Sequence, residues 1–279
     1  MFRAAWWSSN VLLGVALLSL IYTSGWEYSV RQYLDGFSDA IVPNSLPAEQ
    51  KVDAILNWMR VGGARAVAAN PDALAGRDPE NTLNYQQLLK VCGTATNAFL
   101  NLARSSDLRV RRLLLLTPVQ TTKHVVAEVW LSGQWIVVDP TFRAIMRDAQ
   151  GRYLTRKDLQ DPAVFAEAIR AIPNYPREYT FDHFTHVRLA RLPFEGFRLG
   201  PLLDKIHPGW DESIDWSLLL ERESFFYLAL SAAAAFFFLL LRTLLGWYAD
   251  HRISIPRFHL RRHAARAGSA FFSTPEIRQ

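Results

Sequence analysis

The amino-acid sequence predicts an α+β domain that lies between two transmembrane helices. Three observations support this prediction: a long apolar stretch near each end of the chain, helical spacing of apolar residues in the early part of the region between them, and alternating apolar residues directly afterwards. A helix followed by antiparallel strands is typical of α+β domains. The 279 residues leave room for one domain of ordinary size between the two apolar stretches.

The first apolar stretch covers residues 4–26, which contain 23 residues and no charge. About 20 mostly apolar residues suffice to cross a bilayer as a helix, and tryptophans flank the stretch as they do at membrane interfaces. We therefore expect residues 1–26 to form an N-terminal signal anchor. The alternative is a cleaved signal peptide, because the strongest apolar run, residues 11–22, is short and small residues follow it.

The second apolar stretch begins at Ser224 and contains 18 uncharged residues, up to Leu241. It extends to Tyr248 if the long side chain of Arg242 reaches the membrane surface. A buried core helix is the alternative, but an apolar surface on all sides followed by an arginine-rich tail favours a membrane helix. We expect a transmembrane helix over residues 224–248.

The charge of the chain is concentrated behind that second stretch. The formal net charge is +5, from 31 basic and 26 acidic residues, and residues 242–279 carry all of it with seven arginines and two acids. Positively charged flanks stay on the cytoplasmic side, so we expect a cytoplasmic tail at 249–279 and an extracytoplasmic domain at 27–223. In a bacterium this is the periplasmic side of the inner membrane. The domain has a net charge of −1, which argues against a nucleic-acid partner.

Within the domain, apolar spacing predicts helices first and strands afterwards. The expected elements, in chain order, are a helix at 50–61, a polar loop at 70–84, a helix at 86–102, a strand at 110–118, two strands around Ser132-Gly133, and a short helix at 158–172. The remaining part, residues 173–223, is rich in proline and aromatic residues and shows no clear period. We expect it to pack on the domain and to lead the chain back to the membrane.

Three residues of this region have the chemistry of a thiol enzyme. Cys92 is the only cysteine of the chain, so no internal disulfide competes for it, and it stands at the start of a helical run that favours its thiolate. His124 opens one predicted strand and Asp139 ends the next, which gives a base and a group to orient it. Because His124 and Asp139 lie at unequal distances from the turn, their contact requires a stagger or a bulge.

The order of these residues resembles the transglutaminase-like domain of the papain-like superfamily. The resemblance covers about Gln86–Arg143 and depends on Cys-Gly at a helix start, then Leu102-Ala103-Arg104, then the run KHVVAEVWLSGQWIVVDPT. It implies a helix bearing the cysteine packed on an antiparallel sheet, and a Cys92, His124, Asp139 triad of nucleophile, general base and orienting carboxylate. It also implies an oxyanion held by the backbone N–H of Cys92, with Gln86 or Gln87 as an auxiliary donor.

Three positions depart from the family pattern. Val126 stands two residues after the histidine, where the family often has tryptophan, Asp107-Leu108-Arg109 replaces a Gly-Ile-Pro turn, and Val91 precedes the cysteine in place of glycine. These differences leave the triad intact and alter the surroundings in which an acyl substrate would bind.

The sequence therefore predicts a membrane-anchored thiol enzyme that acts on amide or peptide carbonyls by acyl transfer or hydrolysis, in cell-envelope or exopolysaccharide-related processes. Two alternatives remain: an inactive membrane-tethered binding or assembly module, and an envelope cysteine peptidase. We expect no cofactor and no metal, although Asp182, His183 and His186 form a weak metal-binding pattern. The expected partners are a protein or peptide substrate, membrane lipids around the two helices, and envelope assembly proteins.

Overall fold

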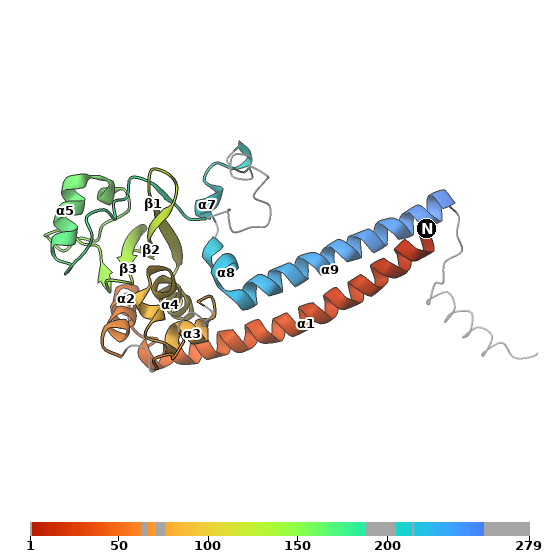
Figure 1. Cartoon of the computed structure of the whole chain (residues 1–279), viewed down its shortest axis with the longest axis horizontal. Helices are drawn as coiled ribbons and strands as arrows, with labels where there is room; N and C mark the ends of the chain where they lie inside the picture. Colours follow the sequence, from red (N-terminus) through yellow and green to blue (C-terminus); the bar gives the residue numbers. More distant parts are fainter. Residues whose placement is uncertain are drawn as a thin grey trace, which may run out of the picture. The chain divides into compact units, whose positions relative to one another are not determined.

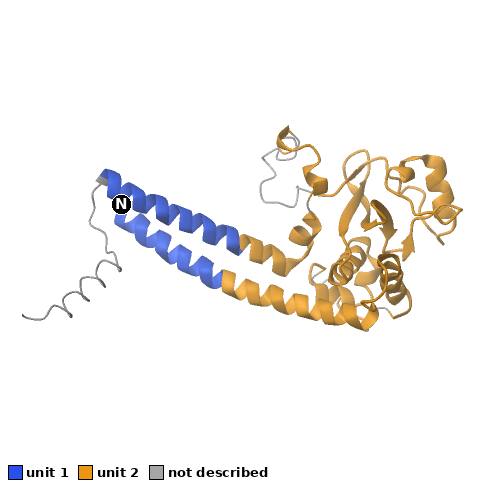
Figure 2. Ribbon diagram, turned by 180° about the vertical axis from the view of Figure 1, so that it is seen from behind, with its two compact units in different colours: residues 1–19, 231–279 blue, residues 20–230 orange. Residues whose placement is uncertain are grey.

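The computed structural model describes residues 2–62, 66–70, 76–187, 203, 205–213 and 215–253. The basic tail predicted to fix the membrane orientation lies almost wholly outside these residues. The chain forms two compact units, residues 1–19 with 231–279 and residues 20–230 (Figure 2).

A five-stranded antiparallel sheet forms the centre of the larger unit (Figure 1). Its strands lie in the order β4-β3-β2-β1-β5, with neighbours paired antiparallel. Their bounds are β1 Val110–Leu116, β2 Thr122–Leu131, β3 Gln134–Asp139, β4 Ala144–Ile145 and β5 Phe184–Thr185. The α+β prediction is confirmed, and the β2–β3 turn falls at Ser132-Gly133, where both residues have positive φ.

The two faces of the sheet carry different parts of the core, because successive residues of a strand point to opposite sides. Ala127 belongs to a cluster built with Phe99 of the helix α4 (Cys92–Ser105) and with α2 (Ala48–Asn57). Val126, on the other face, packs with α5 (Pro162–Arg170). The helix that bears the cysteine thus packs on an antiparallel sheet, as the resemblance implied.

The helix α1 runs from Phe2 to Ile41 without interruption, 40 residues, or about 60 Å at the rise of an α-helix. Its first part is the apolar stretch of the sequence, and its last part belongs to the domain core. Leu34 is completely buried there, and Tyr33 and Phe37 pack against the same cluster. The boundary predicted at residue 26 therefore falls inside a continuous helix.

The second long helix, α9, covers Glu223–Tyr248 and continues as a π-helical turn to Ile253. By length and composition, α1 and α9 are each apolar enough to cross a membrane. Within the smaller unit, polar side chains join them: the hydroxyl oxygens of Ser19 and Ser231 lie 3.0 Å apart, and Arg242 donates from Nε to Oδ1 of Asn10 at 2.7 Å.

Two expectations about local structure were wrong. The polar loop expected at 70–84 contains a helix, α3 (Pro79–Asn84), because Asp78 accepts a hydrogen bond from the N–H of Glu80 and a proline occupies the first turn. The helix expected at 86–102 is divided: a 3₁₀ turn at Leu88–Lys90 precedes α4, which starts at Cys92 and not earlier.

The segment 173–223, which the sequence left unassigned, supplies three short elements among its described residues. They are the edge strand β5 and the helices α7 (Trp210–Ser213) and α8 (Trp216–Glu221). α8 packs along β1, and Arg222 then links it to α9. Arg222 is buried and donates to Oε1 of Glu27 on α1 at 2.9 Å and to Oδ1 of Asn101 on α4 at 3.0 Å.

Candidate active site

Cys92 is the first residue of α4, so its thiol lies where the backbone N–H groups of the helix have no partner within the helix. The N–H groups of Gly93 and of Val125 on β2 both donate toward the sulfur. Hydrogen bonds of this kind and the positive end of the helix dipole favour the thiolate. The start of α4 at this residue therefore gives the thiol an environment that suits a nucleophile.

His124 and Asp139 approach each other diagonally across the β2–β3 hairpin. The register pairs Ala127 with Val138, so Asp139 continues it opposite Val126, two residues from His124 on the same face. Diagonal neighbours of this kind are within reach of long side chains. His124 donates from Nε2 to Oδ2 of Asp139 at 2.7 Å. The stagger that the sequence required is present, and the paired β2–β3 residues show no bulge.

Asp139 is fixed in place by the backbone that follows it. Its Oδ1 accepts hydrogen bonds from the N–H groups of Thr141 and Phe142, at 3.0 and 3.2 Å, and the residue is completely buried. One carboxylate oxygen thus accepts hydrogen bonds from the backbone, and the other accepts a hydrogen bond from the imidazole. Because Nε2 is engaged, the imidazole has Nδ1 left for the thiol of Cys92, with which His124 also forms a hydrogen bond.

The pKa values of the cysteine and histidine move in the directions that favour an ion pair. The hydrogen bond with His124 lowers the pKa of the Cys92 thiol, an effect that exceeds the opposing effect of burial. Burial alone would lower the pKa of His124, but hydrogen bonds with Asp139 and Cys92 and the charges of both raise it to about 9. A thiolate beside an imidazolium is the reactive form of a thiol enzyme.

An aromatic side chain that the sequence did not single out covers the imidazole. The ring of Tyr179 stacks on His124 with the centroids 4.1 Å apart and the planes within 6°. Phe142 and Tyr175 contact the same imidazole at its edges. Tyr175 and Tyr179 come from the segment without a clear period, so the sequence carried no signal for them beyond its wealth of aromatic residues.

Neither of the two glutamines named as auxiliary donors lines the cavity that contains Cys92. Gln87 uses its side-chain amide on the backbone of Ala68, which donates to Oε1 at 3.3 Å and accepts from Nε2 at 3.1 Å. Gln86 is exposed, and its backbone N–H donates to the carbonyl of Ala66 at 3.0 Å. Backbone N–H groups at the start of α4, beginning with that of Cys92, are the donors that the geometry offers to an oxyanion.

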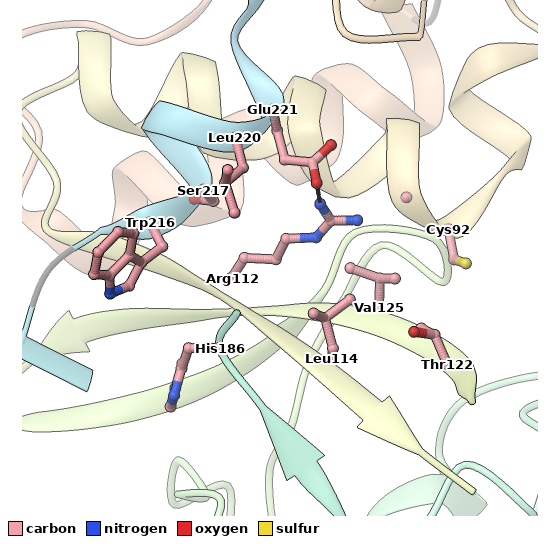
Figure 3. A pocket seen from close by; sticks show the side chains of 11 residues that line it. Cys92, Arg112, Leu114, Thr122, Val125, His186, Trp216, Ser217, Leu220 and Glu221 are labelled. Atoms are coloured by element: carbon pink, nitrogen blue, oxygen red, sulfur yellow. Dashed lines mark ion pairs between the residues drawn. The ribbon is translucent and has the colours of Figure 1, made fainter. Parts of the chain in front are cut away.

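A cavity of about 150 Å³ adjoins the cysteine (Figure 3). Leu114 and Val125 on the sheet and Trp216 and Leu220 on α8 give it apolar walls. An ion pair between Arg112 of β1 and Glu221 of α8 also lines it, and Figure 3 shows this pair between Cys92 and Trp216. The cavity could accept an apolar or neutral group attached to the reacting carbonyl.

One residue of the weak metal-binding pattern, His186, takes part in an ion-pair network. His186 lies 2.9 Å from Oε2 of Glu128 and 3.5 Å from Asp211, and Glu128 also receives Nε of Arg111 at 2.6 Å. Charges of both signs meet here, which is typical of a structural ion-pair network. Among the described residues, no three acidic, histidine or cysteine side chains come together as metal ligands would.

Comparison with known families adds an independent finding to this geometry. Residues 35–140 match the family model described as the transglutaminase-like superfamily. The chain contains a transglutaminase-like domain. The match includes all three residues of the triad, and it begins at Asp35, inside α1, well before the stretch that carried the resemblance in the sequence. No curated protein and no solved structure matched the chain.

The transglutaminase-like domain therefore includes the C-terminal end of α1. This agrees with the burial of Leu34 and Val42 in the cluster behind α4. The resemblance noted in the sequence is confirmed at the level of the family. The sequence motifs mark the part of the domain that holds the triad, and the earlier residues complete the core that supports it.

Proposed function

We propose that the protein is a membrane-anchored thiol enzyme that performs acyl transfer or hydrolysis at amide or peptide carbonyls. The observation that carries this proposal is a chain of two hydrogen bonds that joins Cys92 to His124 and His124 to Asp139. Nε2 of His124 lies 2.7 Å from Oδ2 of Asp139. The lowered pKa of the thiol and the raised pKa of the imidazole are consistent with a poised nucleophile.

In the first half of the reaction, the Cys92 thiolate attacks the carbonyl carbon and forms a tetrahedral intermediate. The negative charge on the carbonyl oxygen faces the N–H groups at the start of α4. The imidazolium of His124 gives its Nδ1 proton to the leaving nitrogen as the carbon–nitrogen bond breaks. An amine departs and a thioester remains on the sulfur.

In the second half, a nucleophile resolves the thioester. Neutral His124 takes a proton from an amine or from water, which attacks the acyl carbon, and the thiolate leaves. An amine gives transamidation and water gives hydrolysis or proteolysis. Asp139 keeps the imidazole oriented and stabilises its charged form in both halves.

The two apolar helices support a membrane location for this chemistry. We propose that α1 and α9 cross a bacterial inner membrane with both chain ends in the cytoplasm and the transglutaminase-like domain in the periplasm, as the arginines of the tail favour. Envelope proteins or peptides would then be the substrates. The role in envelope or exopolysaccharide processes is a proposal of the same kind.

Reaction with iodoacetamide tests the thiol chemistry in the full-length protein. The chain has one cysteine, so every alkylated site is Cys92. We expect the alkylation rate to stay high below the ordinary thiol pKa of about 8.5 and to fall at neutral pH in His124→Ala. A wild-type profile centred near 8.5 and insensitive to His124→Ala would instead favour the inactive binding module.

The products distinguish transamidation from hydrolysis in the second half of the reaction. Incubation of a glutamine-containing peptide with a labelled primary amine gives an isopeptide product by transamidation, whereas hydrolysis gives free acid. Cys92→Ser is the matched control, because it keeps the size of the side chain and removes the thiolate. A thioester detected by mass spectrometry in the wild type only would support both routes.

A further inference from the structure

The cavities beside Cys92 lead toward the helices that would enter the membrane. A second cavity, of about 530 Å³, shares Gly93, Arg112 and Glu221 with the cavity that contains the cysteine. It continues past Val91 to Arg77. The nucleophile is thus joined to a larger space in which a substrate could lie on its way to the sulfur.

Arg77, which lines the second cavity, contacts the start of α9. The guanidinium of Arg77 lies 5.4 Å from the ring centroid of Phe226. Next along the helix, Tyr227 stacks with Trp26 of α1, with the centroids 6.1 Å apart. Tryptophan and tyrosine gather at the membrane–water boundary, so this stacked pair marks the level at which the two helices would leave the bilayer.

One of the three residues that line both cavities, Glu221, is close to α9 along the chain. Glu221 precedes Phe226 by only five positions, a path of about 8 to 18 Å between the helical rise and full extension. Arg222, between them, is fixed by Glu27 and by Asn101. The wall of the active-site cavity is therefore held at a short, fixed distance from the membrane level.

From this geometry we propose that the acyl donor is an amide carried on a membrane-anchored molecule, which reaches Cys92 from the membrane surface through the second cavity. This inference rests on the proposed thiol chemistry and names its substrate class. A donor attached to the bilayer has a high effective concentration at a site that its tether can reach. At a site near the membrane surface, this effective concentration is high only for donors with short tethers.

Lipid-borne reagents test the distance without knowledge of the substrate. The full-length protein in phosphatidylcholine vesicles is treated with iodoacetamide attached to phosphatidylethanolamine through flexible spacers of about 20, 40 and 60 Å. Once a tether spans the distance, the local concentration falls with roughly the −3/2 power of its length, so we expect the 20 Å reagent to react about fivefold faster than the 60 Å reagent. Reaction only at 60 Å would overturn the proposal.

Soluble iodoacetamide, applied to the same vesicles, separates this inference from the proposed function. A reactive thiolate that the soluble reagent alkylates and the short lipid reagent does not would contradict the membrane route and leave the thiol chemistry standing. In a parallel experiment, the iodoacetamide group is attached to a single hydrophobic helical peptide in place of the lipid. Faster reaction from the helix assigns a protein donor, and faster reaction from the lipid assigns a lipid-linked donor; both support the route.

Two exposed valines provide a matched pair of variants. Val91 is 54% exposed and lines the second cavity, and Val119 is 77% exposed on the β1–β2 turn, away from both cavities. We expect Val91→Trp to reduce the ratio of lipid-borne to soluble labelling about threefold or more, because the indole fills the route. Val119→Trp should keep the wild-type ratio. An unchanged ratio in Val91→Trp would contradict the second cavity as the path.

Discussion

The phenol ring of Tyr179 lies flat on the imidazole of His124, with the centroids 4.1 Å apart. Tyr179 belongs to the stretch between α5 and β5, whereas His124 belongs to the second strand of the sheet. The stack covers one face of the imidazole while Nε2 of the same ring donates to Asp139. A cation that lies on an aromatic face is stabilised, so the stack favours the imidazolium form.

We expect Tyr179→Ala to lower the pKa of His124 by about 0.4 to 1.5 units, since a cation–π contact contributes about 0.5–1 kcal/mol at an exposed site and about 2 kcal/mol at a buried one such as that of His124, and one pKa unit equals about 1.36 kcal/mol. Alkylation of Cys92 near pH 7 should slow. Tyr179→Phe keeps the ring and should behave as the wild type. Equal damage from both variants would show that the hydroxyl, and not the ring, is what His124 requires.

Asp139→Asn should change the pH dependence of stability. The pKa of His124 in the folded protein is raised to about 9, so its interaction with Asp139 stabilises the fold fully below the unfolded pKa of about 6.5 and is lost as the pH rises through the folded value. In a Cys92→Ala background, the melting temperatures measured with and without Asp139→Asn should differ most below about pH 6.5. A difference that grows toward alkaline pH would contradict this assignment.

Asp139→Asn should also reduce turnover about 10³-fold or more, as loss of the orienting carboxylate does in related triads. The measurement is the rate of thioester formation from an activated ester substrate. His124→Ala provides the comparison, because the two variants should be similar if the carboxylate acts through the histidine. A nearly wild-type rate for Asp139→Asn would remove Asp139 from the mechanism.

The buried pair of Glu27 and Arg222 should be strongly coupled. Removal of one partner leaves the other charge buried, a change that costs about 3–5 kcal/mol in comparable pairs. We expect Glu27→Leu and Arg222→Leu each to lower the melting temperature of the detergent-solubilised protein, and the double variant to be less destabilised than the sum of the two. Additive effects would contradict a direct interaction.

The C-terminal end of α1 should contribute to the stability of the domain. Leu34 is completely buried in the cluster behind α4, and truncation of a buried leucine to alanine costs about 2–5 kcal/mol. Leu17, on the same helix, is 46% exposed. We expect Leu34→Ala to lower the melting temperature clearly and Leu17→Ala to change it little. Equal effects would argue that α1 supports the domain only as an anchor.

Reporter fusions test the membrane orientation. We expect alkaline phosphatase to be active when it is fused after residue 200, inside the domain, and inactive when it is fused to the C-terminus, because arginine-rich flanks are retained in the cytoplasm. The opposite pattern would reverse the orientation. Activity at both positions would show that α9 does not cross the membrane.

The parts of the fold that were predictable are those with a local period. Alternating apolar residues over 122–139 determine two strands, and Ser132-Gly133 marks their turn. The places of the three candidate residues in the fold were predictable, because Cys92 starts a helix and the other two lie near strand ends. The family match confirms the resemblance, whereas the roles of the three residues remain predictions that the experiments above address.

The parts of the fold and of the site that were not predictable depend on contacts between segments that no local sequence pattern relates. Tyr179 meets His124 only because the stretch after α5 returns across the sheet, and β5 is two residues long. Arg222 finds Glu27 across 195 positions of the chain. The break before Cys92 was also hidden, because the apolar spacing that begins at residue 86 continues through the 3₁₀ turn.

The ion pair between Glu27 and Arg222 has one more consequence. It closes the chain on itself, since two residues 195 positions apart lie within hydrogen-bonding distance. A domain whose ends meet can be inserted into a host without separating the host's own segments. The transglutaminase-like domain is thus an insertion between α1 and α9 along the chain. A different domain with adjacent ends could be inserted between the same two helices.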